Sequence, residues 1–302
     1  MPRRALLLFA AMSVIWGIPY LFIRVAVAEI SPATLVFVRT AIAALILLPI
    51  ALVRRDLRAA LAHWRWVLAF AVAELVVPWI ALFSAEQRVT SALAALLVAG
   101  VPIAGTLIAF LTGARHRFGR AGWAGLALGL VGVALIVGLD LEATDPLALA
   151  EMALVVVGYA IGPAILARRL AGVPSVGIMA LALAACALVY LPLAVALWPA
   201  TLPGPDTLGS VAILAVVCTA LAFLRFPLLV AEVGPVRVTL ITYVNPAVAA
   251  LLGVLVLREP FTLAMGAGFV LVLLGSALAT RAPAGPGSPA GADEPLAEVA
   301  PA

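Results

Sequence analysis

Long apolar stretches are the feature that most constrains this 302-residue chain, because about ten of them follow one another with only short polar connections between them. A helix needs about 20 apolar residues to cross the ~30 Å hydrocarbon layer of a bilayer. The sequence therefore predicts an all-α integral membrane protein with ten transmembrane helices. We place them at residues 6–28, 34–53, 66–84, 91–112, 121–139, 147–167, 175–197, 208–230, 238–257 and 262–280.

The composition agrees with a bilayer as the surrounding medium. Hydrophobic residues make up 66% of the chain and charged residues 11%, with a mean hydropathy of +1.25. So few charges cannot cover the surface of a soluble protein of this size. The net charge of +4 comes from arginines in short clusters between the apolar stretches, and we expect no nucleic-acid partner. We interpret Cys186 and Cys218, both within apolar stretches, as packing residues.

The chain is an internal duplication. Prolines and glycines recur after 142 to 144 residues, which is the spacing of a duplicated unit. The matching positions are Pro32 with Pro174, Leu48-Pro49 with Leu191-Pro192, Pro102 with Pro246, and Gly125/Gly132 with Gly268/Gly275. We predict a first five-helix repeat at residues 5–140 and a second at 146–281. The remaining segment, 282–302, is rich in Pro, Ala and Gly and is predicted to be disordered.

Arginine placement predicts that the two repeats are inserted in opposite directions. The connection from Arg54 to Arg65 is strongly basic, whereas its counterpart from Trp198 to Thr207 has no basic residue. If the N-terminus is cytoplasmic, thirteen arginines lie in inner connections and only Arg88 and Arg258 in outer ones. Because each repeat has five helices, an odd number, the two repeats then have inverted topology. We expect the protein to be integral to the cytoplasmic (plasma) membrane, with both termini in the cytoplasm.

The N-terminus has a second interpretation. Pro2-Arg3-Arg4, the apolar stretch and Ala26-Val27-Ala28 together are also typical of a cleaved signal peptide. We favour a retained helix, because the apolar stretch is too long for a signal peptide and Arg24 interrupts its end. Cleavage would also remove one helix from only one repeat.

Four charged residues inside the predicted helices are candidates for function: Arg24, Arg39, Glu74 and Arg225. Charged groups at membrane depth are costly and face a cavity or a partner. Glu74 is the only acid near mid-membrane, which favours a proton-coupling or cation-binding site. The alternative is a structural pair with Arg39 or Arg225 that fixes helix packing. We expect Arg24 to reach toward the membrane surface and Arg39 to be structural, while Arg225 stays open between the two roles.

Prolines inside the helices free backbone carbonyls and allow kinks, so Pro78, Pro102, Pro227 and Pro246 are candidate hinges. Fixed kinks that serve packing alone are the alternative. Polar and aromatic residues beside them, or at equivalent repeat positions, are candidate solute ligands. Together with Glu74 and Arg225, these are Trp16, Tyr20, Trp79, Tyr159, Thr242, Tyr243 and Asn245.

Enzymatic signatures are absent from the sequence. Only two histidines, His63 and His116, are present, and no cluster of metal ligands or Gly-x-Ser-x-Gly elbow occurs. A chain without lysine has no phosphate-binding loop, so ATP does not drive it directly. We expect no enzyme activity, cofactor or metal.

Several short motifs follow one another along the two copies of the repeat. They are Trp16-Gly17, Pro32 with Arg39, Thr90-Ser91-Ala92 to Pro102, Asn245-Pro246, Leu257-Arg258-Glu259-Pro260, and Gly268 with Gly275. In this order they resemble the ten-helix, EamA-type members of the drug/metabolite transporter superfamily over about residues 5–281. One departure is Ala114, where a glutamate usually follows the fourth helix. The resemblance implies export or exchange of small metabolites or drugs through a cavity lined by helices 1, 3, 4, 6, 8 and 9.

We therefore predict a secondary transporter that moves small metabolites, amino-acid-like solutes or drugs by alternating access. A passive channel, a non-transporting membrane sensor or scaffold, and a lipid-modifying enzyme are the alternatives, the last lacking the residues it needs. The protein is a monomer or homodimer; four-residue spacings such as Gly125/Gly129 are too common in this alanine-rich chain to indicate a dimer.

Overall fold

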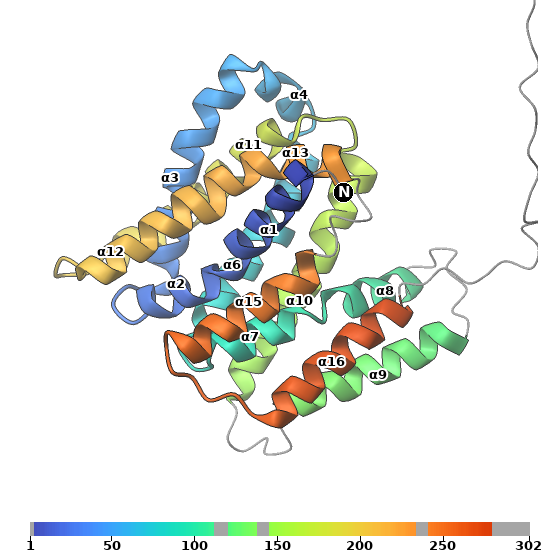
Figure 1. The fold of residues 1–302 in the computed structure, drawn as a ribbon. Helices are drawn as coiled ribbons and strands as arrows, with labels where there is room; N and C mark the ends of the chain where they lie inside the picture. The colour runs from blue at the N-terminus through green and yellow to red at the C-terminus, as the bar shows by residue number, and fades with distance from the viewer. Residues whose placement is uncertain (1–2, 112–119, 138–144, 234–240, 280–302) are drawn as a thin grey trace, which may run out of the picture.

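The computed structural model describes residues 3–111, 120–137, 145–233 and 241–279 (Figure 1). All regular structure in these ranges is helical. The first copy contains α1 (Arg3–Gly17), α2 (Pro19–Ala26), α3 (Pro32–Val53), α4 (Asp56–Ala62), α5 (Trp64–Ala71), η1 (Val72–Val76), α6 (Val77–Ala85), α7 (Ser91–Val98), α8 (Val101–Leu111) and α9 (Arg120–Val137). The second contains α10 (Pro146–Arg169), α11 (Ser175–Ala196), α12 (Pro205–Ala212), η2 (Ile213–Leu221), α13 (Ala222–Val233), α15 (Ile241–Leu255) and α16 (Leu263–Ala279).

Seven helical stretches of the described chain are long and apolar enough to cross a membrane. Three shorter apolar helices, Gly122–Val137, Val244–Leu255 and Leu263–Leu278, lie where the other three spans were predicted. Large apolar side chains also stand on the surface, among them Leu45 at 72% and Leu188 at 69% exposure. Such a surface suits hydrocarbon rather than water. The protein is therefore an integral membrane protein. The count of ten transmembrane helices and the boundaries of the repeats stay predictions. The predicted disorder of 282–302 also stays a prediction, because this segment lies outside the described residues.

Equivalent helices of the two copies pack against each other in antiparallel pairs. The Thr34 hydroxyl, at the start of α3, donates to the carbonyl of Leu197 at the end of α11, at 3.2 Å. At the opposite end of this pair, Gly177 near the start of α11 lies against the backbone of Asp56, just after α3. The chain directions of α3 and α11 are therefore opposite.

The other pairs are antiparallel as well, but the first helix of each copy packs against the third helix of the other copy rather than against its own equivalent. Arg4 at the start of α1 bonds Glu232 at the end of α13, and Glu29 after α2 accepts from the backbone N–H of Gly204 before α12. The helix α6 runs opposite to α10, and α7 begins beside the end of α15. This pairing is what a two-fold axis between two copies produces, and it agrees with the predicted inverted repeat.

The pair α9 and α16, side by side in Figure 1, shows why glycines recur in both copies. A Cβ added at Gly132 would lie 2.6 Å from the carbonyl oxygen of Gly268, and one at Gly275 would lie 2.6 Å from that of Gly125. Only glycine permits this backbone approach. The small-residue spacing of the sequence is therefore used within one chain.

Both copies interrupt their third helix with a π-helical segment at the equivalent place, η1 in the first and η2 in the second. Pro78 follows η1 by two residues and has no N–H to continue the α-helical pattern. In η2 the Thr219 hydroxyl donates to the carbonyl of Leu214 at 2.7 Å and satisfies a carbonyl there. Short π segments within α-helices are frequent at functional sites.

Candidate functional site

Arg39 connects three elements at the interface of the two copies. Its side chain on α3 is 5% exposed, and its Nε donates to the Thr219 hydroxyl of η2 at 2.9 Å. The guanidinium also lies over the Trp79 ring of α6, 3.9 Å from the ring centroid. A desolvated cation over an indole face is attracted by about 2 kcal/mol. Arg39 therefore holds α3, α6 and η2 together.

Tyr190 makes the corresponding contact from the second copy to the π segment of the first. From α11 of the second copy, its hydroxyl donates to the carbonyl of Val76 in η1 at 2.8 Å. Each π segment is thus bound by the second long helix of the opposite copy. The two contacts use different side chains, because the position equivalent to Tyr190 in the first copy is apolar.

Glu74 lies in η1 and points at α10. A Cβ at Gly162 of α10 would collide with the Glu74 carboxylate, so the two helices approach closely here. The Glu74 Oε2 atom is buried and has no hydrogen-bond partner in the described chain. No ion pair joins Glu74 to Arg39 or Arg225 among the described residues, so the structural-pair alternative has no support in the geometry.

Two predicted tyrosines lie near this group. Tyr159 of α10 lies close to Trp79 and is within electrostatic reach of Glu74. Tyr20 of α2 is 6% exposed and is within electrostatic reach of Tyr159 and Arg39. The structure therefore brings together four of the predicted ligands, Tyr20, Glu74, Trp79 and Tyr159, around the buried Arg39.

Other predicted ligands lie apart from this group. Trp16 packs on Phe226, with 4.8 Å between ring centroids, in a separate apolar cluster. The Asn245 amide, in the orientation that satisfies both of its hydrogens, donates to the carbonyls of Ser13 and Ile241 at 3.0 Å. Both residues therefore have packing partners between helices.

The last three predicted ligands are on α13 and α15. Arg225 is exposed and lines a recess of about 650 Å³ near the start of α1, together with Arg3 and Arg4. Thr242 is exposed, and the side chain of Tyr243 lies outside the described residues. The predicted contact of Arg225 with the Glu74 region is not present, since the two residues lie in different parts of the bundle.

The predicted hinges differ in their surroundings. Pro78 is buried, and a Cβ at Gly158 would lie 2.5 Å from its ring. Pro102 follows a break in the helix between α7 and α8, and its carbonyl accepts from the Thr106 hydroxyl at 2.7 Å. Pro227 and Pro246 lie inside α13 and α15. Motion at these prolines stays a prediction.

The two ends of the bundle differ. We call the end at residues 27–34, 86–92, 197–204 and 256–262 the Glu86 end, and the opposite end, at the start of α1, the Arg3 end. The recess lined by Arg225 lies at the Arg3 end, and a second recess, of about 450 Å³, is lined by Ser31, Gln87 and Leu197 at the Glu86 end. At the Glu86 end, polar contacts join the helices: Arg24 donates to the main-chain carbonyl of Glu86, and Gln87 donates to that of Val27 at 3.3 Å.

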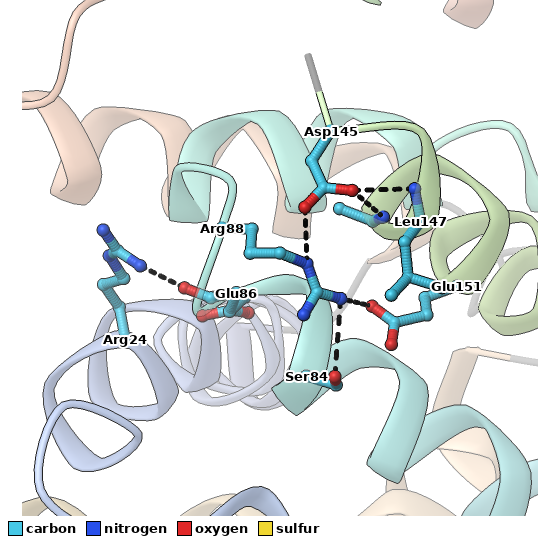
Figure 2. A network of polar contacts seen from close by, with 8 residues as sticks. Arg24, Ser84, Glu86, Arg88, Asp145, Leu147 and Glu151 are labelled. Atoms are coloured by element: carbon cyan, nitrogen blue, oxygen red, sulfur yellow. Dashed lines mark hydrogen bonds and ion pairs between the residues drawn. The ribbon is translucent and has the colours of Figure 1, made fainter.

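Figure 2 shows the Glu86 end from close by. Arg88 bonds Asp145 at 3.0 Å and also contacts the Glu151 carboxylate, so it connects the segment after α6 to the start of α10. Arg24 donates to the main-chain carbonyl of Glu86, which directly follows the span Trp64–Ala85. The expectation that Arg24 reaches the membrane surface stays a prediction.

Glu259 is a functional candidate that appeared in the sequence only as part of a motif. Its carboxylate accepts from the backbone N–H groups of Ser91 and Ala92, at 2.9 and 3.0 Å, and from the Ser91 hydroxyl at 2.9 Å. A carboxylate at the first N–H groups of a helix satisfies orphan donors and opposes the helix dipole. Glu259 of the second copy thus caps the N-terminus of α7 in the first copy. Ala114, the departure from the family motif, lies outside the described residues.

The comparisons with known proteins agree with this architecture. The profile of the EamA-like transporter family matches residues 3–138 and again residues 147–281. The chain belongs to the EamA-like transporter family. This match covers both predicted repeats and confirms the resemblance to the drug/metabolite transporter superfamily.

One solved structure, described only as the crystal structure of a protein, is 22% identical to the chain. The alignment covers 93% of this chain and 97% of the chain in that structure, with a TM-score of 0.63, and shows a shared fold. No curated protein matches the chain.

Proposed function

We propose that the protein is a secondary transporter that exports or exchanges small metabolites, amino-acid-like solutes or drugs across the cytoplasmic membrane. Alternating access comes from rocking of the two copies around the group formed by Tyr20, Glu74, Trp79 and Tyr159. The observation that carries the proposal is the position of Glu74. The buried Oε2 atom of its carboxylate has no hydrogen-bond partner in the described chain, and the residue lies in a π segment at the interface of two antiparallel copies of a transporter-family domain. Both termini are cytoplasmic, and the repeats have inverted topology.

Glu74 is the proposed coupling acid. A carboxylate that has no hydrogen-bond donor is costly to bury ionised, and taking up a proton removes this cost. Gly162 of α10 lies so close to Glu74 that a Cβ added there would collide with the carboxylate, so this carboxylate and α10 are in contact. Movement of α10 against η1 would change how much water reaches the carboxylate. Transport driven by a proton gradient follows from that arrangement.

The test is flux in proteoliposomes with an imposed pH gradient. A panel of the common amino acids and the cationic dye ethidium serve as solute probes, chosen after a thermal-shift screen, since ligands that bind the folded form raise its apparent stability. Uptake that follows the gradient in wild type and is lost in Glu74→Gln supports the proposal. An Asp206→Asn variant, which removes an exposed acid, is the matched control and is expected to keep wild-type rates. Wild-type rates in Glu74→Gln would exclude Glu74 from coupling.

Two alternatives stay distinguishable in the same preparation. A flux that rises linearly with solute concentration indicates a passive channel. A protein without flux for any probe that co-purifies with a stoichiometric membrane partner indicates a sensor or scaffold.

A further inference from the structure

Glu86 is a second acid with buried carboxylate oxygens, at the end of the bundle opposite the recess lined by Arg225. It directly follows the last residue of the span Trp64–Ala85 and is 0% exposed. Neither of its carboxylate oxygens has a hydrogen-bond partner within the described residues. A glutamate side chain in a short connection between helices ordinarily reaches water. This one is enclosed instead.

The polar groups around Glu86 are already engaged elsewhere. Arg24 donates to the main-chain carbonyl of Glu86 rather than to its carboxylate. Glu259, the nearest acid on the second copy, bonds the start of α7. No arginine lies within ion-pair distance of the Glu86 carboxylate in the part of the chain that the structure describes. The carboxylate therefore has neighbours of both signs but no direct bond.

The charges that face Glu86 act in opposite directions. Burial raises the pKa of the Glu86 carboxyl well above its usual range, and the charge of Glu259 raises it further. Arg24 on α2 and Arg39 on α3 lower it, but less than burial raises it. Tyr20 on α2 and Tyr159 on α10 are the titratable groups within electrostatic reach. Burial therefore favours the protonated, neutral form of this carboxyl in this conformation.

We infer that Glu86 binds a proton when the Glu86 end of the bundle is closed and releases it when that end opens to water. The inference rests on the alternating access of the proposed function and assigns a proton site separate from Glu74, on the connection 86–90 rather than inside η1. Opening would part the contacts of Arg24 and Gln87 with their main-chain acceptors and admit water to the carboxylate.

The sign of the pH effect follows from the two environments. In the closed form the pKa of Glu86 is raised, whereas in an open form water solvates the carboxylate and the pKa returns toward about 4.3. The closed form therefore binds the proton more tightly, and low pH favours closure. Raising the pH toward the closed-form pKa favours opening of the Glu86 end. A Glu86→Gln variant, which resembles the protonated acid, stays closed at every pH.

A labelling experiment without any solute tests this inference. In a background that carries Cys186→Ala and Cys218→Ala, a single cysteine replaces Val27, which is 6% exposed at the Glu86 end. A second protein carries Leu202→Cys, which is 85% exposed, and corrects for the pH dependence of the thiol reaction. The reaction rate with a membrane-impermeant maleimide is measured from pH 5 to pH 9 in proteoliposomes. The ratio of the two rates reports opening.

We expect the ratio to rise at least fivefold with pH in wild type, to stay flat and low in Glu86→Gln, and to rise again, at a shifted midpoint, in Glu86→Asp. An Asp206→Asn variant, which changes an exposed acid at the same end, is expected to match wild type. A flat wild-type ratio, or an unchanged rise in Glu86→Gln, would overturn the inference.

Two further arms separate the inference from its rivals. At fixed pH, addition of sodium ions is expected to leave the ratio unchanged, and a sodium-dependent ratio would replace the proton with a metal cation. Glu74→Gln is expected to keep the pH-dependent rise, and its loss there would assign the titration to Glu74. Labelling requires no flux, so a protein that transports nothing yet labels as expected would contradict the proposed function while supporting the proton site.

Discussion

Arg39 and Thr219 are joined by a 2.9 Å hydrogen bond although 180 residues separate them in the chain. The bond connects the second long helix of the first copy to the π segment of the second. Tyr190 and Val76 form the reciprocal contact at 2.8 Å. The interruption of each third helix is therefore held from the opposite copy, and relative movement of the copies would act on both π segments.

Removal of the Thr219 hydroxyl leaves the Arg39 Nε buried without an acceptor and takes a donor from Leu214. We expect Thr219→Val to lower the free energy of unfolding by about 1 to 3 kcal/mol, the usual cost of an unsatisfied buried group. Equilibrium unfolding in mixed detergent micelles, followed by tryptophan fluorescence, measures the change. A Thr201→Val variant, which changes an exposed threonine in the connection before α12, serves for comparison. A loss below 0.5 kcal/mol in Thr219→Val would show that Arg39 finds another acceptor.

Replacement of Arg39 itself should have a smaller effect on stability. Arg39 has no carboxylate partner within the described residues, so its charge pays a desolvation cost that an apolar side chain of similar volume does not. We expect Arg39→Met to change the free energy of unfolding by less than about 1 kcal/mol while lowering the rate of solute flux. The flux assay and the unfolding assay together check this. A loss of several kcal/mol would indicate that the contacts with Trp79 and Thr219 outweigh desolvation.

Close packing between α6 and α10 makes Gly158 sensitive to substitution. A Cβ there would lie 2.5 Å from both the carbonyl oxygen of Ala73 and the ring of Pro78, and the backbone oxygen cannot move alone. We expect Gly158→Ala to destabilise the protein by about 1 to 3 kcal/mol through overpacking. Gly209→Ala is the matched control: nothing lies within 4 Å of its Cβ, and alanine favours α12 by up to about 1 kcal/mol. Equal stabilities of the two variants would contradict the packing.

Sequence reasoning located the helices and the duplication because both depend on local patterns. Apolar length predicts a membrane helix, and the recurrence of prolines and glycines marks equivalent positions. The close contacts of Gly132 and Gly268 explain why those glycines recur. Tyr20, Glu74, Trp79 and Tyr159 were predicted as ligands from membrane depth and repeat position, and they lie together in the fold.

Long-range packing decided what the sequence could not. Glu86 was placed in an outer connection just past the predicted helix 66–84, where an acid ordinarily meets water. Only the arrangement of α2, α3 and α10 around it determines its burial. The π segments also have no reliable local signal apart from Pro78, since η2 contains no proline. Arg225 was grouped with Glu74 by depth alone, although the two are on different sides of the bundle.

The carboxylate of Glu259 should stabilise the closed Glu86 end. Glu259→Gln keeps the size of the side chain but removes its charge and leaves a single acceptor for three donors. We expect a loss of about 1 to 2 kcal/mol from weaker capping of α7. Faster maleimide labelling of the Val27→Cys protein at pH 6 would accompany it. Glu29→Gln, which changes the acid that accepts from Gly204, is the comparison; labelling that rises only there would place the closing contact at α12.

The two contacts that hold the π segments offer a test of their independence. Tyr190→Phe removes only the hydroxyl that donates to Val76, so it should cost about 1 kcal/mol. Thr219→Val acts on η2, and the two substitutions have no partner in common. Changes at separate sites add to within about 0.5 kcal/mol, so the double variant should lose the sum of the two single losses. An interaction energy above 1 kcal/mol would mean that the two contacts depend on each other within the folded state, and would contradict their independence.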